Sequence, residues 1–319
     1  MTIKRLALLT ILLTYLLIVF GGYVASSKSG MGCGPEWPLC NGDVVPTLHR
    51  DTLIEFTHRV IGAILGIVSF LLFAKILRTK VSPSVRSVGF WMLVLLIIQV
   101  LLGAIVVLKD LPTSVIAGHL IIALLFLTSL IWIWRRTEEE GDIHHRPAGH
   151  SEKQKGIKRH FNIALFLLLA VFGLGAYVKH DSLGMICGAF ACRDSLLPVT
   201  VPEIIQTIHR GLAFVSALYI FFLVYLSFKN GWGDKLQNRL VFSAITVFIQ
   251  IVLGVLTILK FIDISWAMLH LATGTLLFAL IVEARVYLGT AAFLKTKPNI
   301  ATNQPIANKN RCVKIARVP

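Results

Sequence analysis

The sequence predicts an all-α integral membrane protein, with eight transmembrane helices arranged as two four-helix bundles that repeat in parallel. Three observations predict this class: an apolar composition, eight apolar stretches of membrane-spanning length, and an internal repeat. Hydrophobic residues make up 56% of the 319-residue chain, charged residues only 15%, and the mean hydropathy is +0.78. Such a composition is typical of membrane proteins and not of a soluble domain.

Each apolar stretch approaches the roughly 20 residues that a helix needs to cross the hydrocarbon core of a bilayer. In lipid, a segment of this length satisfies its backbone hydrogen bonds as an α-helix. The apolar region of a signal peptide is an alternative for residues 6–20, which follow Lys4 and Arg5, but the repeat requires a helix there. The predicted helices cover residues 6–25, 54–77, 88–108, 114–134, 161–179, 203–228, 240–259 and 264–288.

Four histidines recur at an offset of 151 residues, and the residues around them recur with them. They form two pairs, each 61 residues apart: His58 with His119, and His209 with His270. The segment IQVLLG at 98–103 likewise matches IQIVLG at 249–254. Each copy contains an even number of helices, so both copies enter the membrane in the same direction. This predicts a parallel repeat about an axis along the membrane normal.

The distribution of basic residues predicts the orientation. The N-terminus and alternate loops carry 23 Lys and Arg residues, against six on the opposite side. This asymmetry places both termini in the cytoplasm. The net charge of +15 then reflects contact with anionic lipid, and nucleic-acid binding is not expected. The predicted units are an N-terminal bundle (1–134), a cytoplasmic linker (135–160), a C-terminal bundle (161–288) and a basic cytoplasmic tail (289–319).

Two close pairs of cysteines fall in predicted external loops. Cys33 and Cys40 lie in the first such loop and Cys187 and Cys192 in the third, whereas Cys312 is cytoplasmic. Paired external cysteines indicate disulfides in an oxidising compartment. Each bond either stabilises its loop or takes part in redox exchange. A structural role is favoured for Cys187–Cys192, and the two roles are balanced for Cys33–Cys40. Zinc is disfavoured because no histidine lies at ligand spacing nearby.

The four repeated histidines lie inside predicted membrane helices, near the external ends. Ionisable groups at that depth are costly and rare, which indicates a function. Two neutral imidazoles on neighbouring helices suit haem, whose iron takes axial ligands on both faces of a flat ring. Zinc or copper would lack a third ligand. The sequence therefore predicts two haem-type sites, His58/His119 and His209/His270.

Other residues of the repeat suit such sites. Arg59 and Arg210 directly follow a histidine and are candidates for pairing with haem propionates. Gly62, Gly103 and Gly254 would permit close approach of the ring. The remaining histidines lie outside the apolar stretches and are most simply solvated: His49, His144, His145, His150, His160 and His180.

One difference separates the two sites. Glu55 lies three residues before His58, on the same helical face, and its counterpart in the second copy is Gln206. A carboxylate at the first site and an amide at the second predict that only the first site handles protons, with Glu55 as a general acid–base. The alternative is an interfacial carboxylate that pairs with Arg59 or is solvated in the loop.

Together these features resemble haem A synthase over nearly the whole chain. The resemblance rests on EFTHRVIG at 55–62, WPLCNG at 37–42, the tandem eight-helix repeat, the paired external cysteines and the Glu55/Gln206 difference. It is closest to the bacterial members of the family and implies a multi-pass protein of the bacterial cell membrane. In that family, a methyl group of haem O is oxidised through two successive hydroxylations to the formyl group of haem A.

The resemblance implies a different role for each site. The C-terminal site would hold a permanent haem b through His209, His270 and Arg210. The N-terminal site would receive haem O through His58, His119 and Arg59. Glu55 would then lie beside the reacting edge of the substrate, and Cys33 and Cys40 would matter for activity.

The resemblance also implies partners: contact with the haem O synthase (protohaem farnesyltransferase), and a membrane electron acceptor such as a quinone. A different class is a two-haem b-type cytochrome that carries electrons between quinol and external thiols or disulfides. The Glu55/Gln206 difference argues against it, because an electron carrier needs no such asymmetry. A transporter is disfavoured because the helices carry almost no charges near their centres.

Overall fold

The computed structural model describes residues 1–44, 49–137, 152–187 and 198–289. Within these ranges the chain is all-helical, with eight long helices, one short 3₁₀ helix and no strand. All eight long helices are long and apolar enough to cross a membrane, which confirms the prediction of eight spans. They are α1 (Ile3–Ser26), α2 (Arg50–Arg78), α3 (Pro83–Leu108), α4 (Thr113–Arg136), α5 (Glu152–His180), α6 (Val201–Lys229), α7 (Asp234–Leu259) and α8 (Ile264–Tyr287), with η2 (Leu183–Met185) between α5 and α6.

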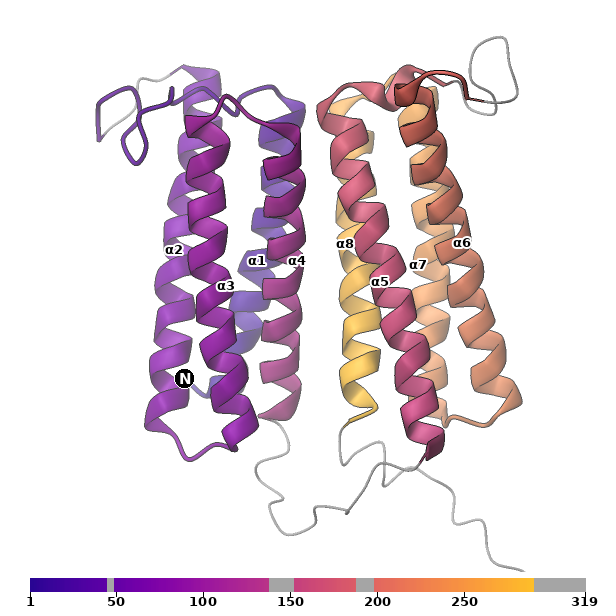
Figure 1. The fold of residues 1–319 in the computed structure, drawn as a ribbon. Coiled ribbons are helices and arrows are strands. Elements are labelled where there is room, and N and C mark those ends of the chain that lie inside the picture. Colours follow the sequence, from indigo (N-terminus) through magenta and orange to yellow (C-terminus); the bar gives the residue numbers. More distant parts are fainter. Residues whose placement is uncertain (45–48, 138–151, 188–197, 290–319) are drawn as a thin grey trace, which may run out of the picture.

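The helices form two four-helix bundles that lie side by side, α1–α4 in one and α5–α8 in the other (Figure 1). Helices α1 and α4 of the first bundle pack against α8 of the second, and α4 also packs against α5. Helices α2, α3, α6 and α7 lie on the outside. The start of α1 and the end of α8 lie at the same end of the molecule, the lower end in Figure 1.

Several helices extend beyond the predicted apolar stretches at this lower end. Helix α3 begins at Pro83, α5 at Glu152 and α7 at Asp234. Each start lies more than one helical turn before the apolar stretch predicted from the sequence. The added turns are polar, so hydropathy alone does not detect them. At the start of α3, the Ser82 hydroxyl accepts a hydrogen bond from the Val85 backbone N–H at 3.4 Å. Residues 152–160, predicted as linker, are therefore helical.

Each bundle has its own apolar core, and α4 contributes to both. Phe126, Leu130 and Ile133 pack into the core of the N-terminal bundle. Leu124 and Leu127, on another face of α4, join the core that extends through the C-terminal bundle. The outward faces of the helices expose large apolar side chains, among them Phe70, Phe90, Phe214 and Phe242. Lipid would cover these faces.

Polar contacts connect the two bundles at the upper end and in the middle of the helices. At the upper end, Thr113 Oγ1 of α4 lies 2.8 Å from His180 Nδ1 of α5. In the middle, the Tyr15 hydroxyl of α1 donates to the Ala272 carbonyl of α8 at 3.1 Å.

His180 and His160 were predicted to be solvated outside the membrane helices. Both instead lie in α5 and are only partly exposed. His160 lies within α5, and its Nδ1 is 2.8 Å from the Tyr219 hydroxyl.

Two tight turns at the upper end have matching geometry at the 151-residue offset. Asp110 and Leu111, between α3 and α4, have φ of 53° and 60°. Phe261 and Ile262, between α7 and α8, have φ of 53° and 57°. Positive φ is uncommon for residues with side chains. The backbone N–H of Leu111 donates to the Val106 carbonyl, and that of Ile262 donates to the Thr257 carbonyl, both at 2.8 Å.

Candidate functional site

The structure brings together the histidines that the repeat pairs. His58 of α2 and His119 of α4 lie in the N-terminal bundle. His209 of α6 and His270 of α8 lie in the C-terminal bundle. Each bundle therefore presents one pair of imidazoles from its two even-numbered helices.

A glycine on the preceding helix lies against each imidazole. The four contacts are Gly21–His58, Gly103–His119, Gly175–His209 and Gly254–His270. A methyl group on these glycines would lie 3.1, 3.3, 2.9 and 3.1 Å, respectively, from the nearest ring atom. Because these distances leave little or no space for a side chain, glycine lets each odd-numbered helix approach the histidine closely.

Sequence reasoning found only some of these glycines. Gly103 and Gly254 were predicted to permit close approach of a haem ring; the structure places them against imidazoles, and their role toward haem stays a prediction. Gly21 and Gly175 were missed because they are 154 residues apart and not 151. A separate alignment of the first helix of each copy would have found them. Gly62 contacts no imidazole, since a methyl group there would meet only Leu17, at an ordinary 3.9 Å, and its predicted role in approach of a haem ring stays a prediction.

Two glutamines contact the histidines of α4 and α8. Gln99 Nε2 lies 3.1 Å from His119 Nε2, and Gln250 Nε2 lies 3.3 Å from His270 Nε2. Both glutamines belong to the repeated IQ segments, but sequence reasoning assigned them no role in a site. The Nδ1 atoms of His119, His270 and His209 are buried without a hydrogen-bond partner among the described residues.

The unpartnered ring nitrogens allow us to ask whether these residues could bind haem. A buried polar atom without a partner is destabilising, and coordination of iron by the imidazole would satisfy it. Among the residues that the structure describes, no three His, Cys, Asp or Glu side chains gather as a metal site. Each pair thus supplies two ligands, the number that haem iron takes from a protein in bis-histidine coordination, and the donor set fits haem.

Glu55 connects the loop that contains Cys33 and Cys40 to the helix that bears His58. Its side chain is buried, at 4% exposure. Oε2 accepts a hydrogen bond from the Cys33 backbone N–H at 2.8 Å, and Oε1 accepts one from Arg59 Nε at 3.1 Å. Arg59 Nη1 also donates to the Leu39 carbonyl at 2.7 Å. The ion pair with Arg59, the alternative considered for Glu55, is therefore present, and a role in proton transfer stays a prediction.

Gln206 occupies the matching place in the C-terminal bundle. Its Oε1 accepts a hydrogen bond from the Cys187 backbone N–H at 2.8 Å, and its Nε2 donates to the Gly184 carbonyl at 2.6 Å. Arg210 Nη2 donates to the Cys187 carbonyl at 3.2 Å. The two bundles thus differ here mainly in chemistry, because a carboxylate can accept a proton and a neutral amide cannot readily do so.

The predicted disulfide between Cys33 and Cys40 is present. It closes the loop whose backbone N–H binds Glu55 and whose Leu39 carbonyl binds Arg59. Cys187 is also engaged in a disulfide. Its predicted partner Cys192 lies outside the described residues.

Comparison with known proteins decides the family. The family model COX15-CtaA, described as cytochrome oxidase assembly protein, matches residues 4–282, which include all eight helices except the last turns of α8. This chain belongs to that family. Within the cytochrome oxidase assembly protein family, "Heme A synthase" of Bacillus cereus (strain 03BB102) is 30% identical over 316 residues, covering 95% of this chain and 98% of the relative.

Other similar relatives have the same name. "Heme A synthase" of Bacillus anthracis (strain A0248) is 30% identical, also over 95% of this chain and 98% of the relative. That of Bacillus pumilus (strain SAFR-032) is 26% identical over 84% and 89%, respectively. Family membership and eight membrane-spanning helices make this chain a multi-pass membrane protein. The relatives are named as an enzyme, so the comparisons do not support the alternative of a pure electron carrier.

Proposed function

We propose that this chain is a haem A synthase, an oxidoreductase that converts a methyl group of haem O to the formyl group of haem A. Family membership and relatives of that name support the activity. One observation carries the assignment of the two sites: Glu55 and Gln206 occupy equivalent hydrogen-bonding positions, but only Glu55 can act as a base.

In this proposal, haem O binds in the N-terminal bundle between His58 and His119. Oxidation of a methyl to a formyl group withdraws electrons, releases protons and adds an oxygen atom, so a group near that carbon that accepts protons would assist the reaction. Glu55 is one helical turn from His58 and its carboxylate is buried. Arg59, which donates a hydrogen bond to Glu55, is also a candidate partner for the propionates of haem O.

The C-terminal bundle is the proposed site of a permanent haem b, between His209 and His270 with Arg210 beside them. The buried ring nitrogens of both histidines and the neutral amide of Gln206 support a site that binds haem without handling substrate protons. Haem b would supply one-electron transfer when bound. The electrons would pass to a membrane acceptor such as a quinone, and the haem O synthase would deliver the substrate.

We further propose that the bundles are a parallel repeat with both termini in the cytoplasm. The matching φ values at 110–111 and 261–262 and the matching glycine–histidine contacts support the repeat. The excess of basic residues in the loops of the lower end supports the orientation. The histidines would then lie near the external face of the membrane. The proposed units remain the two bundles, the linker between them and the basic tail.

Analysis of the bound haems tests this assignment. The protein would be purified from cells that make haem O, and its pigments extracted and separated for the parent, His58→Ala and His209→Ala. The parent is expected to contain haem b together with haem O or haem A. His58→Ala should lose the farnesylated haems and keep haem b, and His209→Ala should lose haem b. Exposed His49 provides the control, since His49→Ala should match the parent. Haem b alone in both sites of the parent would contradict the proposal.

A further inference from the structure

Haem O carries a farnesyl tail that haem b lacks, so the site for haem O needs apolar space that the site for haem b does not. The tail replaces a vinyl group on the edge of the ring opposite to the propionates. If Arg59, which also bonds the external loop at Leu39, pairs with the propionates, the tail points down into the bundle. The residues one and two turns below the histidines then decide which haem each bundle accepts.

In the C-terminal bundle, an aromatic ring occupies this level. A methyl group on Gly274, one turn below His270, would lie 3.3 Å from Phe172 Cζ and 3.0 Å from Gln250 Nε2. Phe172 also packs against Phe278 in an edge-on contact, with the ring centroids 6.2 Å apart. The Phe172 ring of α5 thus reaches α8 directly below the histidine and closes the bundle there.

The N-terminal bundle has aliphatic side chains at the corresponding positions. The counterpart of Phe172 is Ile18, at the offset of 154, and that of Gly274 is Ala123, at the offset of 151. Both are buried in the apolar core that α4 shares with the C-terminal bundle. An isoleucine has no ring that reaches across the bundle, and the alanine methyl group occupies a place that Phe172 leaves free only for glycine.

Helix α2 has a surface without side chains below His58. Gly62 and Gly66 follow His58 at intervals of four residues, so they lie on successive turns, Gly66 about 12 Å further down. A methyl group on Gly62 would meet only Leu17 of α1, at 3.9 Å, and one on Gly66 would meet nothing within 4 Å. At the level where this surface begins, His119 Nδ1 is buried without a hydrogen-bond partner among the described residues, which indicates a ligand there.

The matching surface of α6 carries methyl groups. Its residues at these two positions are Ala213 and Ala217. Ala217 is 7% exposed and belongs to the apolar core of the C-terminal bundle. The level that is open beside Gly66 is therefore packed in the C-terminal bundle.

Gly66 lies at the edge of the lipid-facing surface of α2. Leu65 and Ser69, on one side of it, are buried, whereas Ile67 and Phe70, on the other side, are exposed. Gly66 itself is partly exposed. An apolar chain that follows the two glycines would therefore leave the bundle beside Gly66 and end among lipid.

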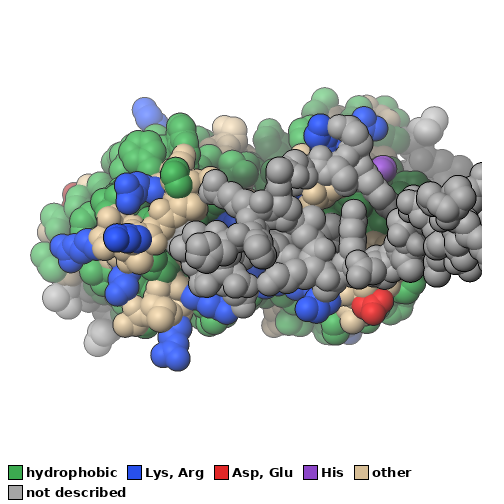
Figure 2. Space-filling model, turned by 90° about the horizontal axis from the view of Figure 1, so that it is seen from below, with side chains coloured by type: hydrophobic (Ala, Val, Ile, Leu, Met, Phe, Trp, Pro, Cys, Tyr) green, Lys and Arg blue, Asp and Glu red, His purple; other side chains and the backbone are tan. Residues whose placement is uncertain are grey.

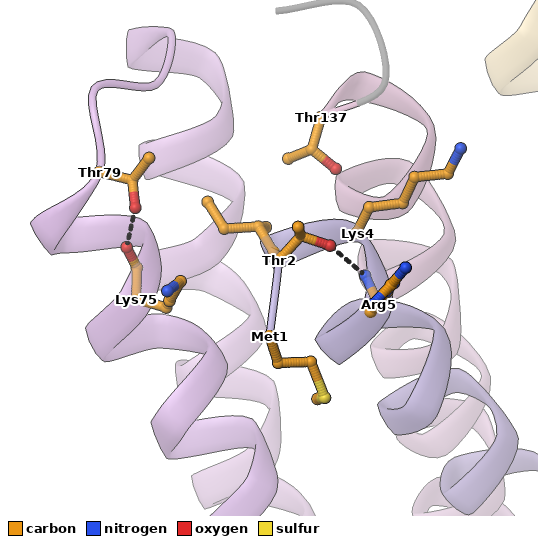
Figure 3. A pocket seen from close by; sticks show the side chains of 8 residues that line it. Met1, Thr2, Lys4, Arg5, Lys75, Thr79 and Thr137 are labelled. Carbon is orange, nitrogen blue, oxygen red and sulfur yellow. Dashed lines mark hydrogen bonds between the residues drawn. The ribbon is translucent and has the colours of Figure 1, made fainter.

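The packed core below closes the downward direction. Seen from below, the lower end of the molecule shows Lys and Arg side chains, which suit water and lipid headgroups better than hydrocarbon (Figure 2). A pocket of about 580 Å³ lies at this end, between the start of α1 and the ends of α2 and α4 (Figure 3). Along α2, buried Leu65 and Leu72 separate His58 from this pocket, and Met92 of α3 belongs to the same core.

We propose that the farnesyl tail of haem O runs along Gly62 and Gly66 and leaves the bundle beside Gly66. In the C-terminal bundle, Phe172 and the alanines at 213 and 217 close the same route, so that site accepts only a haem without a tail. Gly66 and Phe172 thus set the haem specificity of the two sites. The inference rests on the proposed assignment of haem O to the N-terminal bundle.

Haem binding by the full-length protein tests the proposal. In the His209→Ala background only the N-terminal site binds haem, and the haem-free protein in detergent is titrated with haem O or haem b. Adding Gly66→Leu places a side chain in the route of the tail but not in the place of the ring. It should weaken binding of haem O roughly 10- to 100-fold and leave binding of haem b unchanged.

Gly118→Leu in the same background is the matched control. A methyl group on Gly118 of α4 would also meet nothing within 4 Å, and its counterpart in the second copy is exposed Leu269. The control adds the same side chain to the same bundle outside the route. It should bind both haems as the background does.

The reverse exchange keeps the test valid if Gly66→Leu folds poorly. In the His58→Ala background only the C-terminal site binds haem. Phe172→Ile combined with Gly274→Ala copies Ile18 and Ala123 into this site. The double exchange should raise the affinity for haem O relative to that for haem b, whereas a general loss of packing would weaken both.

The outcomes separate this inference from the proposed function. Equal weakening of both haems by Gly66→Leu, or no weakening of haem O, would overturn the route along α2. An unchanged preference after the double exchange at 172 and 274 would overturn the role of Phe172. Failure of the His209→Ala protein to bind any haem O would instead contradict the assignment of haem O to the N-terminal bundle.

Discussion

The Glu55 carboxylate accepts a hydrogen bond from the backbone N–H of Cys33 at 2.8 Å. Gln206 accepts the corresponding bond from Cys187 at the same distance. Two chemically different side chains thus hold the same part of their loops. An amide oxygen is sufficient to accept this hydrogen bond. The bond to the loop therefore does not explain why the N-terminal bundle has a carboxylate at this position.

We therefore expect Glu55→Gln to keep the fold and the bound haem but to lose activity. The glutamine can still accept the Cys33 hydrogen bond, as Gln206 does in the other bundle, but it cannot accept a proton. General acid–base groups typically contribute about 10²- to 10⁴-fold, and haem A formation should fall by a factor in that range. The measurement is haem A produced per protein, with the haem absorption spectrum as the check on binding.

The reciprocal variant Gln206→Glu serves as the control. It places a carboxylate at the site that we assign to haem b, and it should leave the position of substrate oxidation unchanged. Parent-level haem A formation by Glu55→Gln would eliminate a proton-transfer role for Glu55 and leave its pairing with Arg59 as its function.

The pairing of the histidines and the number of helices could be predicted because both depend on local, periodic signals. Apolar length predicts a span, and the 61-residue spacing that recurs in both copies associates His58 with His119 without knowledge of the packing. The polar first turns, such as residues 152–160 of α5, could not be predicted in this way, because capping and contacts stabilise them and hydropathy does not. His160 is one consequence, since Tyr219 on another helix is its partner.

The supporting residues of the site were harder to predict. Gln99 and Gln250 recur at the correct offset, but an amide in a membrane helix has many uses, and only the fold shows which histidine it contacts. Gly21 and Gly175 lie before a connection that is three residues shorter in the second copy, so a single offset does not align them. Packing between helices decides their role.

Gly175→Ala should weaken haem binding in the C-terminal bundle. The added methyl group would lie 2.9 Å from the His209 ring, so the ring or the helix must move. Gly211→Ala is the control, since its methyl group would meet nothing within 4 Å and alanine favours a helix by up to about 1 kcal/mol. The haem-to-protein ratio should fall for the first variant and stay at the parent value for the second. Equal ratios would show that the close contact does not matter.

Gln250→Leu should weaken the C-terminal haem site without affecting the N-terminal one. The substitution removes the partner of His270 Nε2, so the imidazole loses a contact that orients it. Loss of a residue that orients a metal ligand typically costs about 10- to 100-fold in affinity. Gln99→Leu is the matched variant for His119, and it should affect the haem O site instead. Haem content and reduction potentials measured on both variants would show whether each effect stays within its bundle.

Replacing both Cys33 and Cys40 by serine should lower haem A formation more than the content of haem b. The disulfide closes the loop whose Cys33 N–H and Leu39 carbonyl hold the side chains of Glu55 and Arg59. This loop belongs to the N-terminal bundle, whereas His209 and His270 lie on α6 and α8 of the other bundle. A parallel loss of both haems would instead indicate a general loss of folding.

Glu283 is predicted to stabilise the contact between the bundles at the lower end. Its carboxylate on α8 bonds Arg135 of α4 and accepts from Arg239 Nε of α7 at 2.8 Å. Glu283→Gln would remove the negative charge that both guanidinium groups contact. Hydrogen bonds to charged groups contribute about 1.5 to 3 kcal/mol, so the variant should unfold at a clearly lower temperature in detergent. Asp234→Asn, which removes an exposed carboxylate from the same end, should unfold at nearly the parent temperature. If both variants melted alike, the Arg135–Glu283–Arg239 contact would contribute no more than surface charge does.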